Sequence, residues 1–280
     1  MNDQPTPSTS ENPAANFLPR QSFVYQKYLA LPAILTRHPG ALLEGTLGVC
    51  VGLERDGAEL AIAATLAGAA FLGIDPNPQT LKLSQQHHAC DFVVNTLDEA
   101  LRVLKNAIRK RQPIAVGLLG DAAEILPRMV ERGVQPDFLS DTTHLDASAA
   151  IQSAKASLAQ RGSLLLNFGP ELEAVELPRE TLRWVGWTST GFQDMQRMDA
   201  LALSHLPATD AARRRWLQGA SAYFYRQIPL ERVCALSLEE ITALQSALED
   251  PAWRASLRSP ITLAWQDAAR NPQTRCVEPR

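Results

Sequence analysis

The chain has 280 residues, with 27 Lys and Arg against 30 Asp and Glu, which gives a formal net charge of −3. This balance argues against a general nucleic-acid binder of the basic-patch type and predicts no attraction to an acidic membrane surface. Aromatic residues make up only 6% of the chain, too few for a platform that stacks single-stranded bases. No apolar run reaches the roughly 18 residues that span a bilayer.

The N-terminal segment is expected to be a disordered tail. Residues 1–20 are rich in Pro, Ser, Thr and Asn, and burial of their few apolar side chains could not offset the entropy of ordering. The segment lacks a basic start followed by an apolar stretch, so no secretory signal is expected. The cysteines Cys50, Cys90, Cys234 and Cys276 form no CxxC pair. We therefore expect a reduced, cytoplasmic protein rather than a disulfide scaffold.

After this tail, apolar strands alternate with amphipathic helices. A short helix is expected around residues 23–31, interrupted at Pro32. The pattern then predicts strands at residues 47–51, 70–74, 92–94, 114–119, 137–139 and 163–167, and helices at 58–69, 96–111, 121–132 and 148–160. Strands that alternate with helices of this length indicate βαβ units, and hence an α/β fold with a parallel sheet.

Beyond about residue 191 the pattern becomes mostly helical. Helices are expected at residues 193–205, 210–225, 237–248 and 260–270, with Pro251 and Pro260 between them. The sequence thus predicts three parts, which are a tail (1–20), an α/β domain (21–190) and a mostly helical C-terminal region (191–280).

The first strand-to-helix turn carries part of a dinucleotide-binding pattern. In G-x-G-x-x-G, the glycines serve a tight turn, close approach to the pyrophosphate, and packing of helix on strand. Gly52 and Gly57 fill the first and third places, Arg55 and Asp56 lie between them, and Glu54 occupies the second. At ~4 Å and an effective dielectric constant of ~20, the Glu54 carboxylate would repel a phosphate by about 4 kcal/mol before screening. Arg55 could offset part of that repulsion.

Asp75 follows at the end of the second strand, where an acid would accept hydrogen bonds from a ribose. Two interpretations of these residues stay open. In one they bind a cofactor, and in the other Gly52 and Gly57 only shape a turn while Asp75 caps a strand.

Two further junctions face the same edge of the predicted sheet. At Gly120-Asp121-Ala122 a helix N-terminus offers N–H groups to an anion, although Asp121 in its more common role would be the N-cap. The next strand ends in the polar residues Thr142, Thr143 and His144, where open α/β sheets place ligands. A polar loop without function is an equally good interpretation of this last group.

The sequence gives no reason to assign catalytic or metal-binding residues. The stretch from His87 to Asp91 contains two histidines and a cysteine, but nothing else supplies ligands at a recognisable spacing, so a surface helix end is the better interpretation. No Ser-His-Asp or Cys-His arrangement can be identified. The basic clusters at residues 105–111 and 213–215 are expected to form solvated helix faces.

Several of these segments resemble urocanase (urocanate hydratase). The clearest stretch is GDAAEILP at residues 120–127, followed by RGVQPD at 132–137 and SDTT at 140–143, and the similarity covers about residues 25–236. The resemblance implies a Rossmann-like, doubly wound, mostly parallel sheet with NAD as cofactor. In that family NAD⁺ acts as an electrophile: the imidazole of urocanate adds to the nicotinamide ring, and water then adds to give imidazolone propionate. Phe168 stands where a family tyrosine would contact the cofactor.

The departures from the family pattern lie in the same places. The family's glycine-rich turn keeps only Gly57 of its later glycines, a family asparagine is Asp121, and the segment with the family's catalytic cysteine has no counterpart. The chain is also about half as long as urocanase. We therefore hypothesise a degenerate homologue, a pseudoenzyme that acts as a (di)nucleotide-binding or regulatory module, as a homodimer or paired with full-length urocanase.

Two alternatives stay open. In the first, the chain is an active NAD-dependent hydro-lyase for urocanate or a related imidazole acrylate in histidine catabolism, completed by a partner chain. In the second, it is a structural protein with an empty nucleotide crevice.

Overall fold

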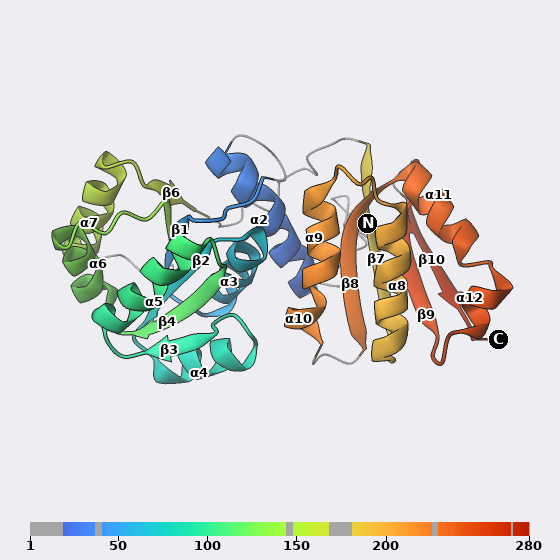
Figure 1. Ribbon diagram of the computed structural model, residues 1–280, viewed down its shortest axis with the longest axis horizontal. Helices are drawn as coiled ribbons and strands as arrows, with labels where there is room; N and C mark the ends of the chain where they lie inside the picture. The colour runs from blue at the N-terminus through green and yellow to red at the C-terminus, as the bar shows by residue number, and fades with distance from the viewer. Residues whose placement is uncertain are drawn as a thin grey trace, which may run out of the picture. The chain divides into compact units, whose positions relative to one another are not determined.

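The predicted alternation of strands and helices builds one parallel sheet, shown in the computed structural model of Figure 1. Its strands are β1 (Leu47–Val51), β2 (Ala70–Asp75), β3 (Phe92–Val94), β4 (Ile114–Leu119), β5 (Phe138–Asp141) and β6 (Leu164–Leu166). Their order is β3-β4-β2-β1-β5-β6, and neighbouring strands run parallel. The expected α/β class with a Rossmann-like sheet is therefore confirmed. The strand order changes direction between β1 and β5, which is the switch point where open sheets of this kind bind ligands.

The structure describes residues 19–36, 41–143, 148–167, 181–225, 229–269 and 271–279. These fall into two compact units. The sheet unit contains the described residues from Phe23 to residue 167 together with Leu206–Tyr225, and the second unit contains residues 19–22, 181–205 and those from 229 onward. This division differs from the boundary expected at residue 190. Most of the predicted tail lies outside the described residues.

The helices of the sheet unit begin and end at local signals. They are α2 (Pro19–Thr36), α3 (Arg55–Ala67), α4 (Pro78–Gln86), α5 (Leu97–Lys110), α6 (Ala122–Glu131), α7 (Ala149–Gln160), α9 (Ala211–Gly219) and α10 (Ser221–Phe224). Thr96 caps α5 as predicted, because its hydroxyl accepts a hydrogen bond from the Glu99 amide at 3.3 Å. The helix α4 was not expected from the sequence. It ends at Gln86 with His87 as its C-cap, so the stretch from His87 to Asp91 begins at a helix end, as predicted.

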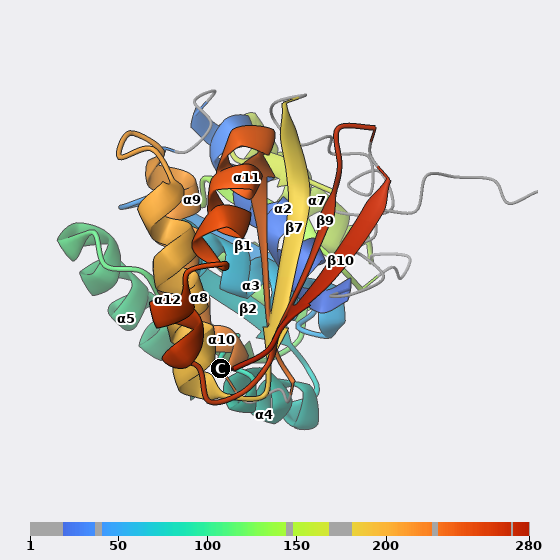
Figure 2. The same cartoon turned by 90° about the vertical axis from the view of Figure 1, so that its right-hand side faces the viewer.

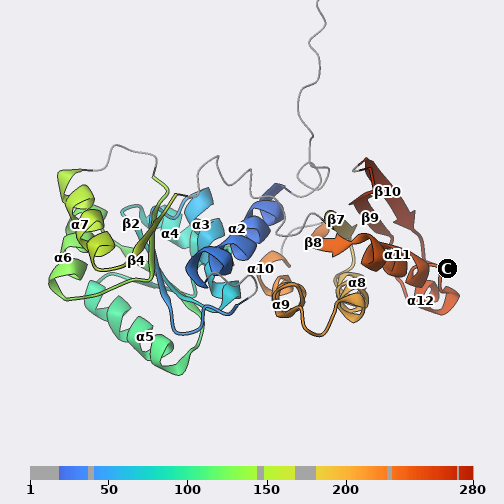
Figure 3. The same cartoon turned by 90° about the horizontal axis from the view of Figure 1, so that it is seen from above.

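One face of the sheet carries an extended apolar core. Valine, leucine and isoleucine side chains of β1, β2, β4 and β5 pack there against α5, α6 and α7, while α3 contacts β1 and β2. The residues buried in this cluster include Val49, Leu72, Val116, Leu126 and Leu158. In the view of Figure 3, α5 and α6 lie on one side of the strands and α3 on the other, which is the doubly wound arrangement.

Pro32 does not interrupt the first helix. The helix α2 continues through it to Thr36, whose hydroxyl donates to the Pro32 carbonyl oxygen at 2.7 Å. The expectation of a break was wrong because Pro32 lies close to the C-terminal end of the helix. Only one backbone hydrogen bond is lost there, and tertiary packing of buried residues such as Tyr25 and Leu31 compensates for it.

The second unit is built around an antiparallel sheet that the sequence did not predict. Its strands are β7 (Leu182–Ser189), β8 (Leu230–Ser237), β9 (Ile261–Gln266) and β10 (Pro272–Val277), in the order β10-β9-β7-β8. Its helices are α8 (Phe192–His205), α11 (Leu238–Ala247) and α12 (Pro251–Ala255). Figure 2 shows β7, β9 and β10 beside α8 and α11.

The helix expected at residues 260–270 is therefore wrong, because β9 occupies this segment. Ile261 and Leu263 are buried while Thr262 between them is half-buried, which is the two-residue period of a strand. The helices expected at 193–205 and 237–248 are confirmed. The one expected at 210–225 forms as the two helices α9 and α10.

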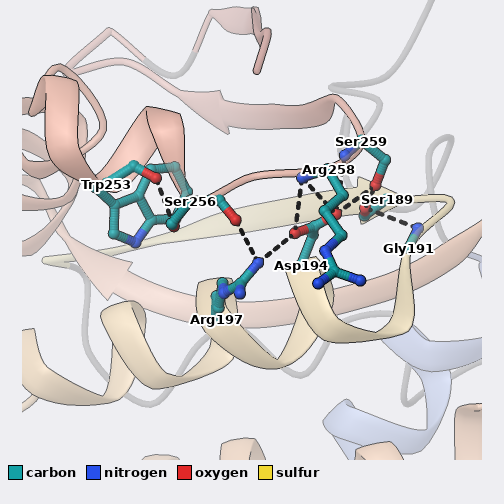
Figure 4. Close-up of polar contacts among 8 residues, drawn as sticks. All are labelled: Ser189, Gly191, Asp194, Arg197, Trp253, Ser256, Arg258 and Ser259. Atoms are coloured by element: carbon teal, nitrogen blue, oxygen red, sulfur yellow. Dashed lines mark hydrogen bonds and ion pairs between the residues drawn. The ribbon is translucent and has the colours of Figure 1, made fainter. Parts of the chain in front are cut away.

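A buried carboxylate ties α8 to the loop before β9. Figure 4 shows Asp194, in the first turn of α8, with hydrogen bonds from the Ser259 hydroxyl at 2.7 Å, the Ser259 amide at 2.9 Å and the Arg258 amide at 3.2 Å. Arg197 donates to it at 3.0 Å, and the Ser259 hydroxyl also contacts that of Ser189. Serine, aspartate and arginine side chains also occur together in catalytic sites. Here the Asp194 carboxylate accepts hydrogen bonds from the loop before β9 and holds that loop in place.

Acid should therefore weaken the second unit. Burial raises the pKa of Asp194, but the hydrogen bonds from Ser259, Arg258 and Arg197 outweigh it and hold the pKa below its ordinary value. The stabilisation is complete above the unfolded pKa of about 3.9 and is lost as the pH falls through the lower folded value. Asp194→Asn should lower the free energy of unfolding at pH 7 by about 1–3 kcal/mol. It should also flatten the loss of stability below about pH 4 in urea titrations. Parallel pH profiles for both proteins would contradict this assignment.

Candidate functional site

The predicted site residues converge on the carboxyl-terminal edge of the parallel sheet. The strand register places Val51 of β1 beside Ile74 of β2 on one side and Asp141 of β5 on the other. Asp75 pairs with Leu119, the last residue of β4. The loops that follow these four strands therefore open at one edge. We call it the strand-end edge, and it holds Gly52, Asp75, Gly120, Asp121, Ala122, Thr142 and Thr143.

The turn after β1 requires both of its glycines. Gly52 has φ +86°, in the left-handed region that side chains disfavour, and its amide donates to the Ile74 carbonyl oxygen at 2.9 Å. A Cβ atom on Gly57 would lie far inside 3.0 Å of the Gly52 carbonyl oxygen, so α3 packs directly on the turn. These are the geometries that the first and third places of the dinucleotide pattern serve.

Glu54, at the second place of the pattern, is the N-cap residue of α3. It is exposed, and its side chain makes no capping hydrogen bond. Arg55 next to it is also exposed and bonds Glu59 at 3.3 Å. The phosphate-facing position of the turn thus presents a carboxylate toward solvent at the end of a helix dipole.

Behind this turn lies a buried ion pair that no sequence pattern indicated. Lys27 of α2 bonds Glu59 of α3 at 2.7 Å, and its ammonium group lies 3.6 Å from Asp56. Lys27 is 4% exposed and Glu59 is 1% exposed. The two residues are 32 positions apart, so no local pattern could have paired them.

Asp75 lies at the predicted strand end, but its side chain points inward to backbone amides. One carboxylate oxygen accepts from the Leu53 amide and the other from the Asn77 amide, both at 2.8 Å. The residue is 4% exposed. Asp75 therefore connects the turn after β1 with the turn after β2, and contact with a ribose would have to use its remaining lone pairs.

At the junction between β4 and α6, Asp121 has the capping role that needs no ligand. Asp121 is the N-cap of α6, where its carboxylate accepts from the Ala123 amide at 2.8 Å, and it remains exposed. The Gly120 amide donates to the Asp75 carbonyl oxygen at 3.1 Å, and Ala122 is buried in the apolar core.

The end of β5 covers the Gly52 turn. The Thr142 hydroxyl donates to the carbonyl oxygens of Gly52 and Val51, at 3.1 and 3.2 Å. Asp141 accepts from the Thr143 hydroxyl at 2.7 Å and pairs with Lys155. Burial alone would raise the pKa of Asp141, but these partners lower it, so the carboxylate stays ionised. The predicted contacts His144 and Phe168 lie outside the described residues.

The described thiols of the sheet unit are inert. Cys50 of β1 is buried, and burial raises its pKa to about 12. Burial likewise raises the pKa of Cys90 to about 12. Neither thiol is ionised near neutral pH, so neither can serve as a nucleophile. All four cysteines of the chain are free.

Other features of the described residues do not add to the site. A surface hollow of about 720 Å³ lies at the amino-terminal end of β4, away from the strand-end edge. Within the ranges given above, no three His, Cys, Asp or Glu side chains come together in a way that could hold a metal ion. No helix in the described part of the chain is long and apolar enough to cross a membrane.

The backbone of the turn after β1 has the geometry of an NAD-binding turn, but the charges around it do not suit the pyrophosphate of NAD. The turn keeps the backbone geometry of a dinucleotide fold at Gly52 and Gly57. The pyrophosphate would meet the carboxylate of Glu54, and the cations beside it are already paired with carboxylates. The residues present therefore do not fit a pyrophosphate.

The parallel sheet and the glycine-dependent turn define a Rossmann-like domain. A family model for the urocanase Rossmann-like domain matches residues 20–161, slightly more than half of the 280 residues. The chain belongs to the urocanase family.

Two solved structures show only weak similarity to this chain. One is PKMT2 from Rickettsia typhi in complex with AdoHcy, with 13% identity and a TM-score of 0.29, and the alignment covers 70% of this chain but only 32% of that chain. The other is human methyltransferase-like protein 13 in complex with SAH, with 12% identity and a TM-score of 0.30 over 83% of this chain and 92% of that chain. Scores this low support no conclusion about the ligand or the reaction.

Proposed function

We propose that this urocanase-family chain is a nucleotide-binding or regulatory module that does not hydrate urocanate unaided. The observation that carries the proposal is the turn after β1, where Gly52 and Gly57 keep the geometry of a nucleotide-binding fold. The family match at residues 20–161 covers this turn. Hydration would in addition need a substrate pocket with water-excluding walls and positioned proton donors. The described residues of the strand-end edge are instead engaged in capping helices and holding turns.

The direct test follows urocanate by its ultraviolet absorbance. The purified chain, supplied with NAD⁺ and urocanate, should leave the absorbance unchanged over hours. A full-length urocanase assayed in parallel should consume the substrate at an ordinary enzyme rate, on the order of 10 s⁻¹. Turnover by this chain alone within about a hundredfold of that rate would contradict the proposal.

A second candidate function is that of a hydro-lyase completed by a partner chain. Membership of the urocanase family favours it, since that family's reaction is the hydration of urocanate. The chain would then pair with a second copy of itself or with a full-length urocanase. Light scattering would detect such a complex, and addition of the partner should restore loss of urocanate. A partner that binds without any gain in turnover would support the regulatory function instead.

A further inference from the structure

We propose that the strand-end edge does not fit the pyrophosphate of a dinucleotide, so that a nucleotide ligand of this edge binds better without its 5′ phosphate groups. This inference rests on the proposed nucleotide-binding function and specifies its ligand class. The family cofactor carries two phosphates, and the charges that this chain presents at the strand-end edge repel them.

Each of the four central strands leads into a carboxylate. Glu54 follows β1, Asp75 ends β2, Asp121 follows β4 and Asp141 ends β5. Because the strands are parallel and in register, these four groups belong to one edge of the sheet. A ligand placed there meets the exposed carboxylates of Glu54 and Asp121, which repel a phosphate. Asp75 is buried on backbone amides and Asp141 is paired with Lys155, so these two contribute less to the repulsion.

The cations that could reverse this field are already paired. Lys155 pairs with Asp141, Arg55 bonds Glu59, and Lys27 lies between Glu59 and Asp56. A pyrophosphate would have to remove one of them from its carboxylate. The Lys27 pair is buried, so that exchange would leave the Glu59 carboxylate without its partner inside the protein.

Glu54 is the residue on which the inference depends most. Asp75, Asp121 and Asp141 each hold a backbone amide or a lysine, which gives them structural roles without any ligand. Glu54 makes no capping bond and is exposed, yet it stands at the start of α3, a helix of 13 residues. The positive end of that helix would otherwise attract a phosphate, and here it faces Glu54 and Asp56 instead.

The turn itself leaves little room for a phosphate. A Cβ atom on Gly52 would lie 3.0 Å from the Thr143 methyl group and 3.1 Å from the Thr142 hydroxyl oxygen. The two threonine side chains thus cover the Gly52 backbone at the switch point between β1 and β5.

The test is a charge series measured by titration calorimetry at low ionic strength. The probes are AMP, adenosine and 5′-amino-5′-deoxyadenosine, which carry negative, no and positive charge at the 5′ position, together with NAD⁺. Affinity should rise in the order AMP, adenosine, aminodeoxyadenosine. We expect at least about a tenfold gap between AMP and adenosine, and NAD⁺ should bind no better than AMP. Higher salt should reduce the differences in affinity between the probes, because it screens exposed charges.

Variants separate the charge of Glu54 from its bulk. Glu54→Gln should reduce the gap between AMP and adenosine, and Glu54→Gly should strengthen NAD⁺ binding further by freeing the backbone. Asp121→Asn should act in the same direction as Glu54→Gln. Glu131→Gln is the matched control, because this exposed residue ends α6 and lies away from the strand-end edge. It removes one charge as well, and the series should stay unchanged.

Each outcome decides a different point. If AMP or NAD⁺ binds as tightly as adenosine, the charge inference fails and the nucleotide-binding function stands. If the differences in affinity between the probes persist in Glu54→Gln and Asp121→Asn, the charges of these two carboxylates are not their cause. If no probe binds to any of the variants or to the unmodified chain, the proposed function itself is overturned.

Discussion

Gly57→Ala is expected to destabilise the sheet unit by about 3 kcal/mol. The added methyl group would collide with the Gly52 carbonyl oxygen, which belongs to the backbone and cannot rotate away. Either α3 must move off the turn or the turn itself must open. Alanine normally stabilises a helical position by about 0.5–1 kcal/mol relative to glycine, so the sign of the change is itself informative. Urea unfolding gives the magnitude.

Gly120→Ala is the matched control for this prediction. It makes the same chemical change at the junction between β4 and α6, where, among the described residues, the new Cβ would meet only the Ile125 side chain, at 3.2 Å. Rotation of that side chain can relieve the contact, so we expect a change within about 1 kcal/mol. Equal losses of stability from the two variants would show that the close approach of α3 to the turn is not the cause.

Asp199→Ala is expected to destabilise the second unit by about 3–5 kcal/mol. Asp199 of α8 accepts hydrogen bonds from Arg232 of β8 at 2.8 and 3.1 Å and from the Trp187 indole at 2.9 Å. Arg232 is 2% exposed, and one of its terminal nitrogens already has no hydrogen-bond partner in the described part of the chain. Loss of the carboxylate would leave a positive charge inside the protein without compensation.

Removal of both charges shows how much of the loss in stability comes from a buried charge that has lost its partner. The double variant Asp199→Leu with Arg232→Met should recover most of the loss, because apolar side chains of similar volume need no partner. The control is the exposed pair Arg275 and Glu249, where Arg275→Ala should change stability by less than about 1 kcal/mol. A double variant as unstable as Asp199→Ala would mean that the carboxylate acts mainly through Trp187.

Local patterns in the sequence were sufficient to locate the strands of the parallel sheet. Alternating strands and helices indicated its six strands, and the cap residues Thr96 and Asp121 start helices as expected. Gly52 and Gly57 could be recognised because a tight turn and a close packing contact allow hardly any other residue type. These signals operate within a few residues, which is the range over which propensity and periodicity act.

The second unit shows where such patterns fail. Leu182 of β7 pairs with Ser237 of β8, and Ser189 of β7 pairs with Ile261 of β9. Pairing between strands so distant in the sequence leaves no local trace. A short apolar segment such as residues 261–266 is therefore ambiguous between helix and strand until its partner is known.

The sequence by itself determined which groups follow the strands of the parallel sheet, and hence that carboxylates gather at the edge where this fold binds ligands. Only the tertiary structure decided which charges remain available there. Lys27 reaches Glu59 from another helix, and Asp75 turns to the backbone amides of two loops. An ion pair or a buried hydrogen bond forms between any groups that the folded chain brings within about 3 Å, regardless of their separation in sequence.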